Sequence, residues 1–182
     1  WWEPDYLARL LTFIQENGLD ISMTGTINYY ESVNGSRINR KLERPVIMTQ
    51  KQYAERYPIY WGFSSTYWGN IMKAEIYKKI NIGEACGKVP GYGQDTGLML
   101  HYLEHCSRIG IDNSALYHYR IRESSVSYHY TPLRFDANVG YTACIRSFLE
   151  KNNALDGEKR AWLRRVHIAA VSATAEALGQ SG

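Results

Sequence analysis

The chain of 182 residues has the length of one domain, or of one domain with an appendage. Its formal net charge of +3 is too small to indicate a nucleic-acid partner. With 45% hydrophobic and 21% charged residues, the composition is typical of a folded protein and excludes a disordered or a membrane-embedded chain. No segment looks like a membrane span or a signal peptide. Because the sequence begins Trp1-Trp2 without methionine, we expect part of a longer protein, and its three widely spaced cysteines favour a cytoplasmic one.

The first third of the sequence predicts one helix followed by strands. Leucine and isoleucine residues recur at helical spacing over residues 4–17 and predict a helix there. Apolar and polar residues then alternate, which predicts a strand over residues 21–30 with one buried face. Asn34-Gly35 favours a tight hairpin turn, so we expect residues 38–47 to return as a second strand.

The middle third predicts short helices and a loop. Thr49 and Gln52 have the spacing of a capping box, which indicates a short helix that ends before Pro58. A glycine-rich segment, residues 83–93, is expected to be a loop. The helix expected from Asp95 onward has one apolar face, formed by Leu98, Met99, Tyr102, Leu103 and Cys106.

The last third predicts a strand over residues 114–122, a polar loop, and helices over residues 136–151 and 157–178. This order of elements indicates a mixed α/β fold in which helices flank a mixed sheet, with a helical extension at the C-terminal end. We expect Cys86, Cys106 and Cys144 to be reduced, buried thiols, since three widely spaced cysteines do not form a disulfide framework.

Three groups of residues could carry chemistry. His101, Glu104 and His105 have the H-x-x-E-H spacing of a zinc peptidase helix, but both histidines lie off the apolar face, which favours solvated side chains. Asp95 begins a helix, where carboxylates often act as caps, yet it projects to the same side as Leu98 and could accept a proton in a cleft.

The third group is cationic. Arg120 and Arg122 are two residues apart in a predicted strand and therefore point the same way. Paired arginines suit phosphate oxygens, although a solvated strand face explains them equally well. The aromatic side chains of residues 59–72, among them Trp61, Tyr67 and Trp68, are typical of core packing more than of a nucleic-acid stacking surface.

The order of several short motifs resembles the later part of family 2 glycosyltransferases, which have the GT-A fold. Residues 2–7 look like the segment that follows the family's acidic D-x-D-D motif, and residues 68–77 are similar to its W-x-K-L segment, with Asn70 in place of lysine. Residues 93–96 resemble its G-E-D-T motif, with Gln94 in place of glutamate. Residues 119–127 are similar to the stretch that ends the catalytic core.

This resemblance implies an inverting transfer of a sugar from a nucleotide-sugar donor to a glycan or polysaccharide hydroxyl. Asp95 would be the general base, while Arg120, Arg122 and Ser125 would contact the donor diphosphate. Trp61, Tyr67, Trp68 and Gln94 would contact the acceptor. The acidic motif that holds a divalent Mg or Mn ion would lie upstream of Trp1, so the resemblance implies no metal ligands in this chain.

The resemblance runs from Trp1 to about Ser127. We expect residues 1–134 to form the acceptor-side half of a GT-A domain and residues 135–182 to form a helical extension. We expect this chain alone to be inactive and to form a homodimer, and the longer protein to associate peripherally with a membrane. Two alternatives stay open at this point. The C-terminal helices could form a non-catalytic interaction module, or His101, Glu104 and His105 could belong to a zinc hydrolase.

Overall fold

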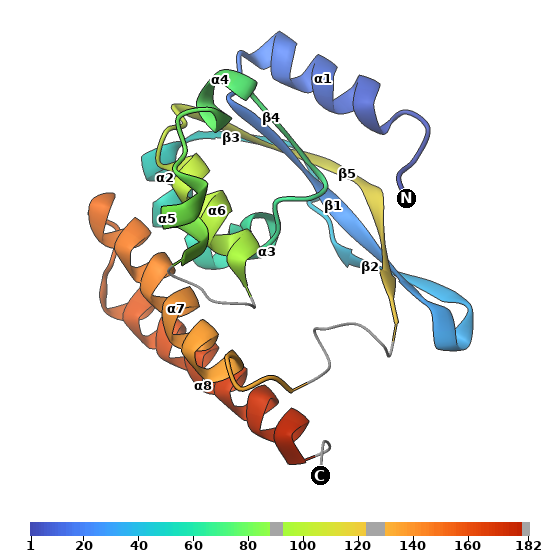
Figure 1. Ribbon diagram of the computed structural model, residues 1–182. Coiled ribbons are helices and arrows are strands. Elements are labelled where there is room, and N and C mark those ends of the chain that lie inside the picture. Colours follow the sequence, from blue (N-terminus) through green and yellow to red (C-terminus); the bar gives the residue numbers. More distant parts are fainter. Residues whose placement is uncertain (88–92, 123–129, 180–182) are drawn as a thin grey trace.

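The computed structural model of the chain describes residues 1–87, 93–122 and 130–179 (Figure 1). The strands are β1 (Ile21–Tyr30), β2 (Gly35–Arg40), β3 (Val46–Thr49), β4 (Asn70–Met72) and β5 (Arg108–Ile121). The helices are α1 (Tyr6–Asn17), α2 (Gln50–Glu55), α3 (Tyr57–Ser64), α4 (Ala74–Tyr77), α5 (Ile82–Gly87), α6 (Gln94–Leu103), α7 (Arg134–Lys151) and α8 (Gly157–Gly179), with a 3-10 turn η1 (Glu31–Val33). The predicted mixed α/β fold is confirmed.

The strands form one mixed sheet in the order β2-β1-β5-β3, and β4 pairs with the first residues of β1. Strand β1 runs parallel to β5, whereas β2, β3 and β4 pair antiparallel with their neighbours. The expectation that residues 21–30 and 114–122 share a mixed sheet is therefore confirmed. The N-terminal segment joins the same sheet, because Trp2 forms an antiparallel bridge with Tyr117.

Helices cover both faces of the sheet (Figure 1). Helix α1 packs on one face, over a small core of Tyr6, Leu10 and Leu116. Gly110 permits its close approach, since a Cβ atom there would lie 2.8 Å from Phe13 Cε1. The other helices that pack on the sheet gather on the opposite face, where α7 and α8 share the main core with β1, β5 and α6.

Two segments differ from the sequence prediction. The return strand expected over residues 38–47 is divided into β2, which pairs with β1, and β3, which pairs with β5 at the other side of the sheet. Pro45, which has no N–H to donate, lies in the crossing between them. The loop expected over residues 83–93 begins as helix α5, where Asn81 Oδ1 accepts a hydrogen bond from Glu84 N (3.2 Å), and residues 88–92 lie outside the described residues.

Cys106 and Cys144 are buried thiols outside any disulfide, as expected, whereas the side chain of Cys86 is outside the described set. None of the helices in the described ranges combines the length and the apolar stretch that a membrane crossing requires.

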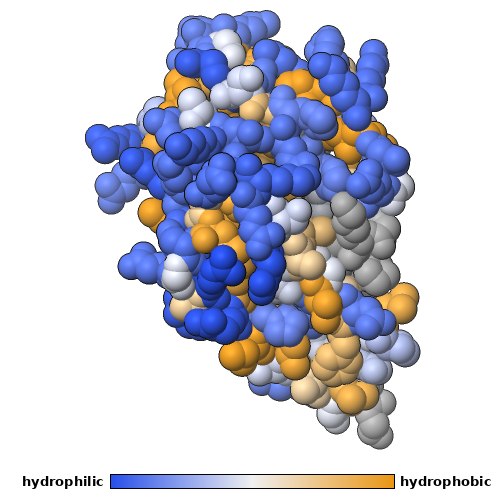
Figure 2. All heavy atoms as spheres, turned by 90° about the vertical axis from the view of Figure 1, so that its left-hand side faces the viewer, coloured by the Kyte–Doolittle hydropathy of each residue, from blue (hydrophilic) through white to orange (hydrophobic). Residues whose placement is uncertain are grey.

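Figure 2 shows hydrophobic residues gathered over the lower ends of α7 and α8. Leu133, which precedes α7, Val139 of α7 and Leu178 of α8 are exposed. The homodimer stays a prediction.

The junction between α1, β4 and β5 contains a carboxyl group whose ionisation stabilises the fold. Asp20 accepts hydrogen bonds from Lys73 Nζ (3.0 Å), Ser107 N (2.7 Å) and Arg108 N (3.0 Å). Burial raises the pKa of Asp20, but these hydrogen bonds outweigh burial and hold the pKa below its ordinary value of 3.8. A lowered pKa in the folded state means that the ionised carboxylate stabilises the native protein.

We therefore expect the free energy of unfolding to decline as the pH falls from about 4 through the lowered pKa of Asp20, because protonation removes this stabilisation. Asp20→Asn should reduce that part of the pH dependence, and it should lower stability at neutral pH. Urea unfolding at a series of pH values measures both effects. Asp5→Asn, a change at an exposed aspartate before α1, is the control. An Asp20→Asn protein with an unchanged pH dependence would contradict the assignment.

Candidate functional site

A cavity of about 660 Å³ lies among α3, the start of α6, the second half of β5, and helices α7 and α8. Its walls combine aromatic rings with polar groups. The aromatic residues are Trp61, Trp68, Tyr119 and Tyr141, and the polar residues are Ser65, Thr66, Gln94, Asp95, Thr96 and Asn138. A cavity of this volume accommodates a small organic molecule.

Asp95 is the carboxylate in this wall, and it lies in the first turn of α6. The N-cap position belongs to Gly93, whose φ of 81° is in the left-handed region that glycine adopts without strain. Burial raises the pKa of Asp95 above its ordinary value of 3.8, while hydrogen bonds from the Trp68 side chain and from its own backbone N–H oppose the shift. Asp95 is therefore a stronger proton acceptor than an exposed aspartate.

Trp68 is held firmly beside Asp95. Its ring stacks on Tyr119, with centroids 4.8 Å apart and an angle of 3° between the planes, and it also stacks on Tyr117 at 4.8 Å. The guanidinium carbon of Arg40 lies 5.6 Å from the Trp68 ring centroid. These contacts fix the orientation of the indole group, so that its N–H can face the carboxyl group of Asp95.

Arg40 stabilises the same cavity wall through hydrogen bonds to the segment before Trp68. Its guanidinium donates to the carbonyl oxygen of Gly62, to Ser65 Oγ (3.4 Å) and to Thr66 Oγ1 (3.0 Å). Burial lowers the pKa of Arg40 to about 10. Thr96 Oγ1 donates to the carbonyl oxygen of Ser65 (3.0 Å), which ties the segment before Trp68 to the start of α6. Arg40 could not be predicted as a site residue from the sequence, because its partners lie 22 to 26 residues further along the chain.

Four of the predicted site residues meet in this cavity, namely Trp61, Trp68, Gln94 and Asp95. Trp61 Nε1 donates to the hydroxyl group of Tyr141 (2.5 Å), which fixes the ring between α3 and α7. Tyr67 is not one of the lining side chains and is 46% exposed.

The predicted arginine pair lies elsewhere. Successive side chains of a strand point to opposite faces, so Tyr119 lines the cavity while Arg120 points to the other face of the sheet. Arg120 and Arg122 lie 3.9 and 3.6 Å from the Glu31 carboxylate, and the Arg120 guanidinium carbon is 5.8 Å from the Trp1 ring centroid. Contact of both arginines with a donor stays a prediction. Ser125 lies outside the described residues.

The H-x-x-E-H residues are not brought together as a metal site. Glu104 accepts a hydrogen bond from Lys151 Nζ at 2.7 Å, and His105 is exposed. Within residues 1–87, 93–122 and 130–179, no group of three His, Cys, Asp or Glu side chains is arranged to hold a metal ion. The zinc hydrolase therefore gains no support from the geometry.

Comparison with known proteins gives no family for this chain. No family model matches the sequence, and a search of curated proteins finds no match. The class of protein must therefore be inferred from the cavity around Asp95 and from the sequence resemblance.

Proposed function

We propose that this chain is the acceptor-side part of an inverting glycosyltransferase, which moves a sugar from a nucleotide-sugar to a hydroxyl group of a glycan or polysaccharide. The observation that carries the proposal is the position of Asp95. Its carboxyl group, with a raised pKa, lines a cavity whose walls include four aromatic side chains. Aromatic faces pack well against the C–H groups of sugar rings, and a carboxylate suits the hydroxyl groups.

The proposed sugar transfer needs one group that takes up a proton and a defined position for the acceptor sugar. Asp95 takes the proton from the acceptor hydroxyl group while that oxygen forms a bond to the anomeric carbon of the donor sugar. The bond between the anomeric carbon and the diphosphate breaks, and the nucleoside diphosphate leaves with the electron pair. Attack from the side opposite the leaving group inverts the anomeric configuration.

The aromatic walls position the acceptor. Trp61 is fixed by its hydrogen bond to Tyr141, and Trp68 is fixed by its contact with Arg40. A rigid wall costs little conformational entropy when the sugar binds, which favours a defined orientation of the reacting hydroxyl group. Helices α7 and α8 contribute Asn138, Tyr141 and Val166 to this cavity, so the C-terminal helices belong to the proposed acceptor site.

The resemblance also implies a divalent metal ion at an acidic motif upstream of Trp1. The described residues do not fit such an ion, because they contain no suitable group of ligands. No step proposed for Asp95 depends on it.

The proposal is tested with the protein extended upstream through the predicted D-x-D-D motif. We expect that this longer protein, with Mg²⁺ or Mn²⁺ and a panel of nucleotide-sugars, releases nucleoside diphosphate in an acceptor-dependent reaction. The 182-residue chain should show neither release nor micromolar binding of any donor in calorimetry. Micromolar donor binding to the 182-residue chain, or an upstream sequence without an acidic motif, would contradict the proposal.

A further inference from the structure

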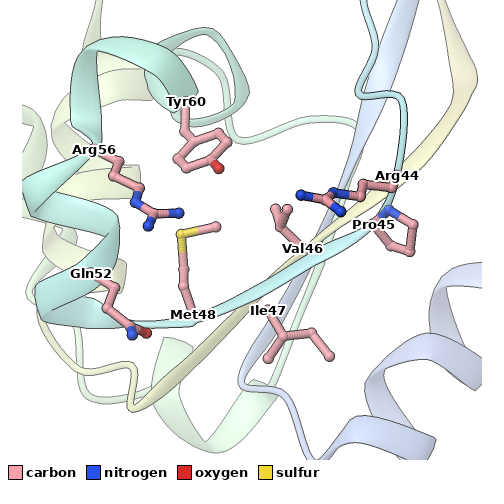
Figure 3. A pocket seen from close by; sticks show the side chains of 8 residues that line it. All are labelled: Arg44, Pro45, Val46, Ile47, Met48, Gln52, Arg56 and Tyr60. Carbon is pink, nitrogen blue, oxygen red and sulfur yellow. The ribbon is translucent and has the colours of Figure 1, made fainter.

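A second cavity, of about 350 Å³, lies between β3 and helices α2 and α3 (Figure 3). It shares no lining residue with the cavity around Asp95. Buried Met48 and Tyr60 and the half-buried Val46 give it an apolar wall. Its remaining lining residues are Arg44, Pro45, Ile47, Gln52 and Arg56.

Each polar side chain of this second cavity has a hydrogen-bond donor. Arg44 and Arg56 extend from opposite sides and direct their guanidinium groups into the same space, towards which the hydroxyl group of Tyr60 also points (Figure 3). Among the described residues, the lining contains no Asp or Glu. Within the described part of the chain, no ion pair is formed by either guanidinium group. Two cations that share a space without a counter-charge attract an anion.

Gln52 adds a donor of fixed orientation. Its Oε1 accepts a hydrogen bond from the backbone N–H of Thr49 (2.9 Å) as part of the capping box that begins α2. Because this bond uses the carbonyl end of the carboxamide, the two N–H groups are left for a ligand.

The backbone under both arginines is anchored. Arg56 N donates to the carbonyl oxygen of Gln52 (3.2 Å), and the carbonyl oxygen of Arg56 accepts from Ile59 N (2.9 Å), so this residue joins α2 to α3 rigidly. Arg44 precedes Pro45, which restricts its backbone to extended conformations. Asn113 Nδ2 fixes the preceding carbonyl group, that of Glu43, at 3.3 Å. Anchored arginines lose less entropy on binding than arginines of a mobile loop.

We propose that this second cavity binds a small phosphate monoester. Guanidinium groups complement phosphate oxygens in charge and form paired hydrogen bonds with them. A phosphate monoester offers three acceptor oxygens to the four donor side chains, whereas a carboxylate offers two. The organic part of the ester packs on Val46 and Met48. A volume of about 350 Å³ suits a sugar phosphate or a nucleoside monophosphate. This proposal does not depend on the glycosyltransferase function.

Binding is measured on the 182-residue chain by NMR titration with inorganic phosphate, a hexose phosphate, a nucleoside monophosphate and the unphosphorylated hexose. We expect the phosphate esters to shift the resonances of Val46, Gln52 and Tyr60, and the unphosphorylated hexose to shift none. Arg44→Gln and Arg56→Gln should each weaken ester binding by about ten- to hundredfold, because each removes charge-assisted hydrogen bonds. Arg164→Gln removes the same charge from the exposed surface of α8 and should leave the affinity unchanged.

The titrations distinguish a phosphate ester from the free phosphate ion as the ligand. Tighter binding of an ester than of inorganic phosphate supports the proposed monoester site, and equal affinities would overturn the ester in favour of the free ion. Shifts outside this cavity, no shifts at millimolar concentration, or equal weakening by Arg164→Gln would overturn the proposal. Unchanged folding of each variant is verified by its amide spectrum.

Discussion

Asp95→Asn is expected to lower turnover of the upstream-extended enzyme by about 10²- to 10⁴-fold, because asparagine cannot accept the proton of the acceptor hydroxyl group. The amide is nearly the same size as the carboxyl group and can keep most polar contacts of the first turn of α6. The free energy of unfolding should therefore change by no more than about 1 kcal/mol. Steady-state kinetics and urea unfolding of both proteins measure the two effects.

The pH dependence provides a second readout for Asp95. In the proposed reaction the carboxylate is the active form, so the rate should fall as the pH falls through its pKa, which burial places above 3.8. This acid limb of the kcat profile should disappear in Asp95→Asn.

Asp136→Asn is the matched control, since Asp136 occupies the equivalent first turn of α7 but does not line the cavity. Near-normal turnover of Asp95→Asn, or an equal loss of turnover in Asp136→Asn, would mean that Asp95 only stabilises the start of a helix.

Trp68→Ala is expected to destabilise the protein by about 2–4 kcal/mol, because it removes a large aromatic side chain together with its ring contacts. The lost contacts are the stacks on Tyr117 and Tyr119 and the contact with Arg40. Trp68→Phe should retain most of the stacking and cost about 1 kcal/mol, the value of the lost hydrogen bond. Urea unfolding measures both changes, and Trp2→Ala, at a 56% exposed side chain, is the control.

Trp68→Phe also tests the contact with Asp95. The Trp68 hydrogen bond favours the charged carboxylate, so its loss should raise the pKa of Asp95 further. NMR titration of the Asp95 carboxyl carbon gives this value directly. An unchanged pKa would mean that Trp68 acts on Asp95 only as a packing surface.

Elements with strong local signals could be predicted from the sequence. The apolar spacing of α1 and α6 and the capping box of Thr49 and Gln52 are local, and the structure contains all three. The first half of β5 was missed, because Gly110, Asp112 and Asn113 are residues that disfavour strands. That half is stabilised by pairing with β1 and β3, which are distant in the sequence.

The candidate site could be predicted only in part, for the same reason. Asp95 and Trp68 were found through short motifs, whereas Arg40, Asn138 and Tyr141 reach the site through contacts far along the chain. The alternation of Tyr119 and Arg120 was visible in the sequence. Which of the two faces meets Asp95 depends on how β5 sits in the sheet, and a periodic pattern does not contain that information.

The most direct test of the central claim is the anomeric configuration of the product, measured by proton NMR on the acceptor glycosylated by the upstream-extended enzyme. A single displacement at the anomeric carbon, with Asp95 as the base, predicts that the new glycosidic bond has the configuration opposite to that of the donor sugar. The Asp95→Asn enzyme should form the same product far more slowly. A product that retains the donor configuration, or the absence of any transfer by an extended protein that binds its donor, would contradict the account.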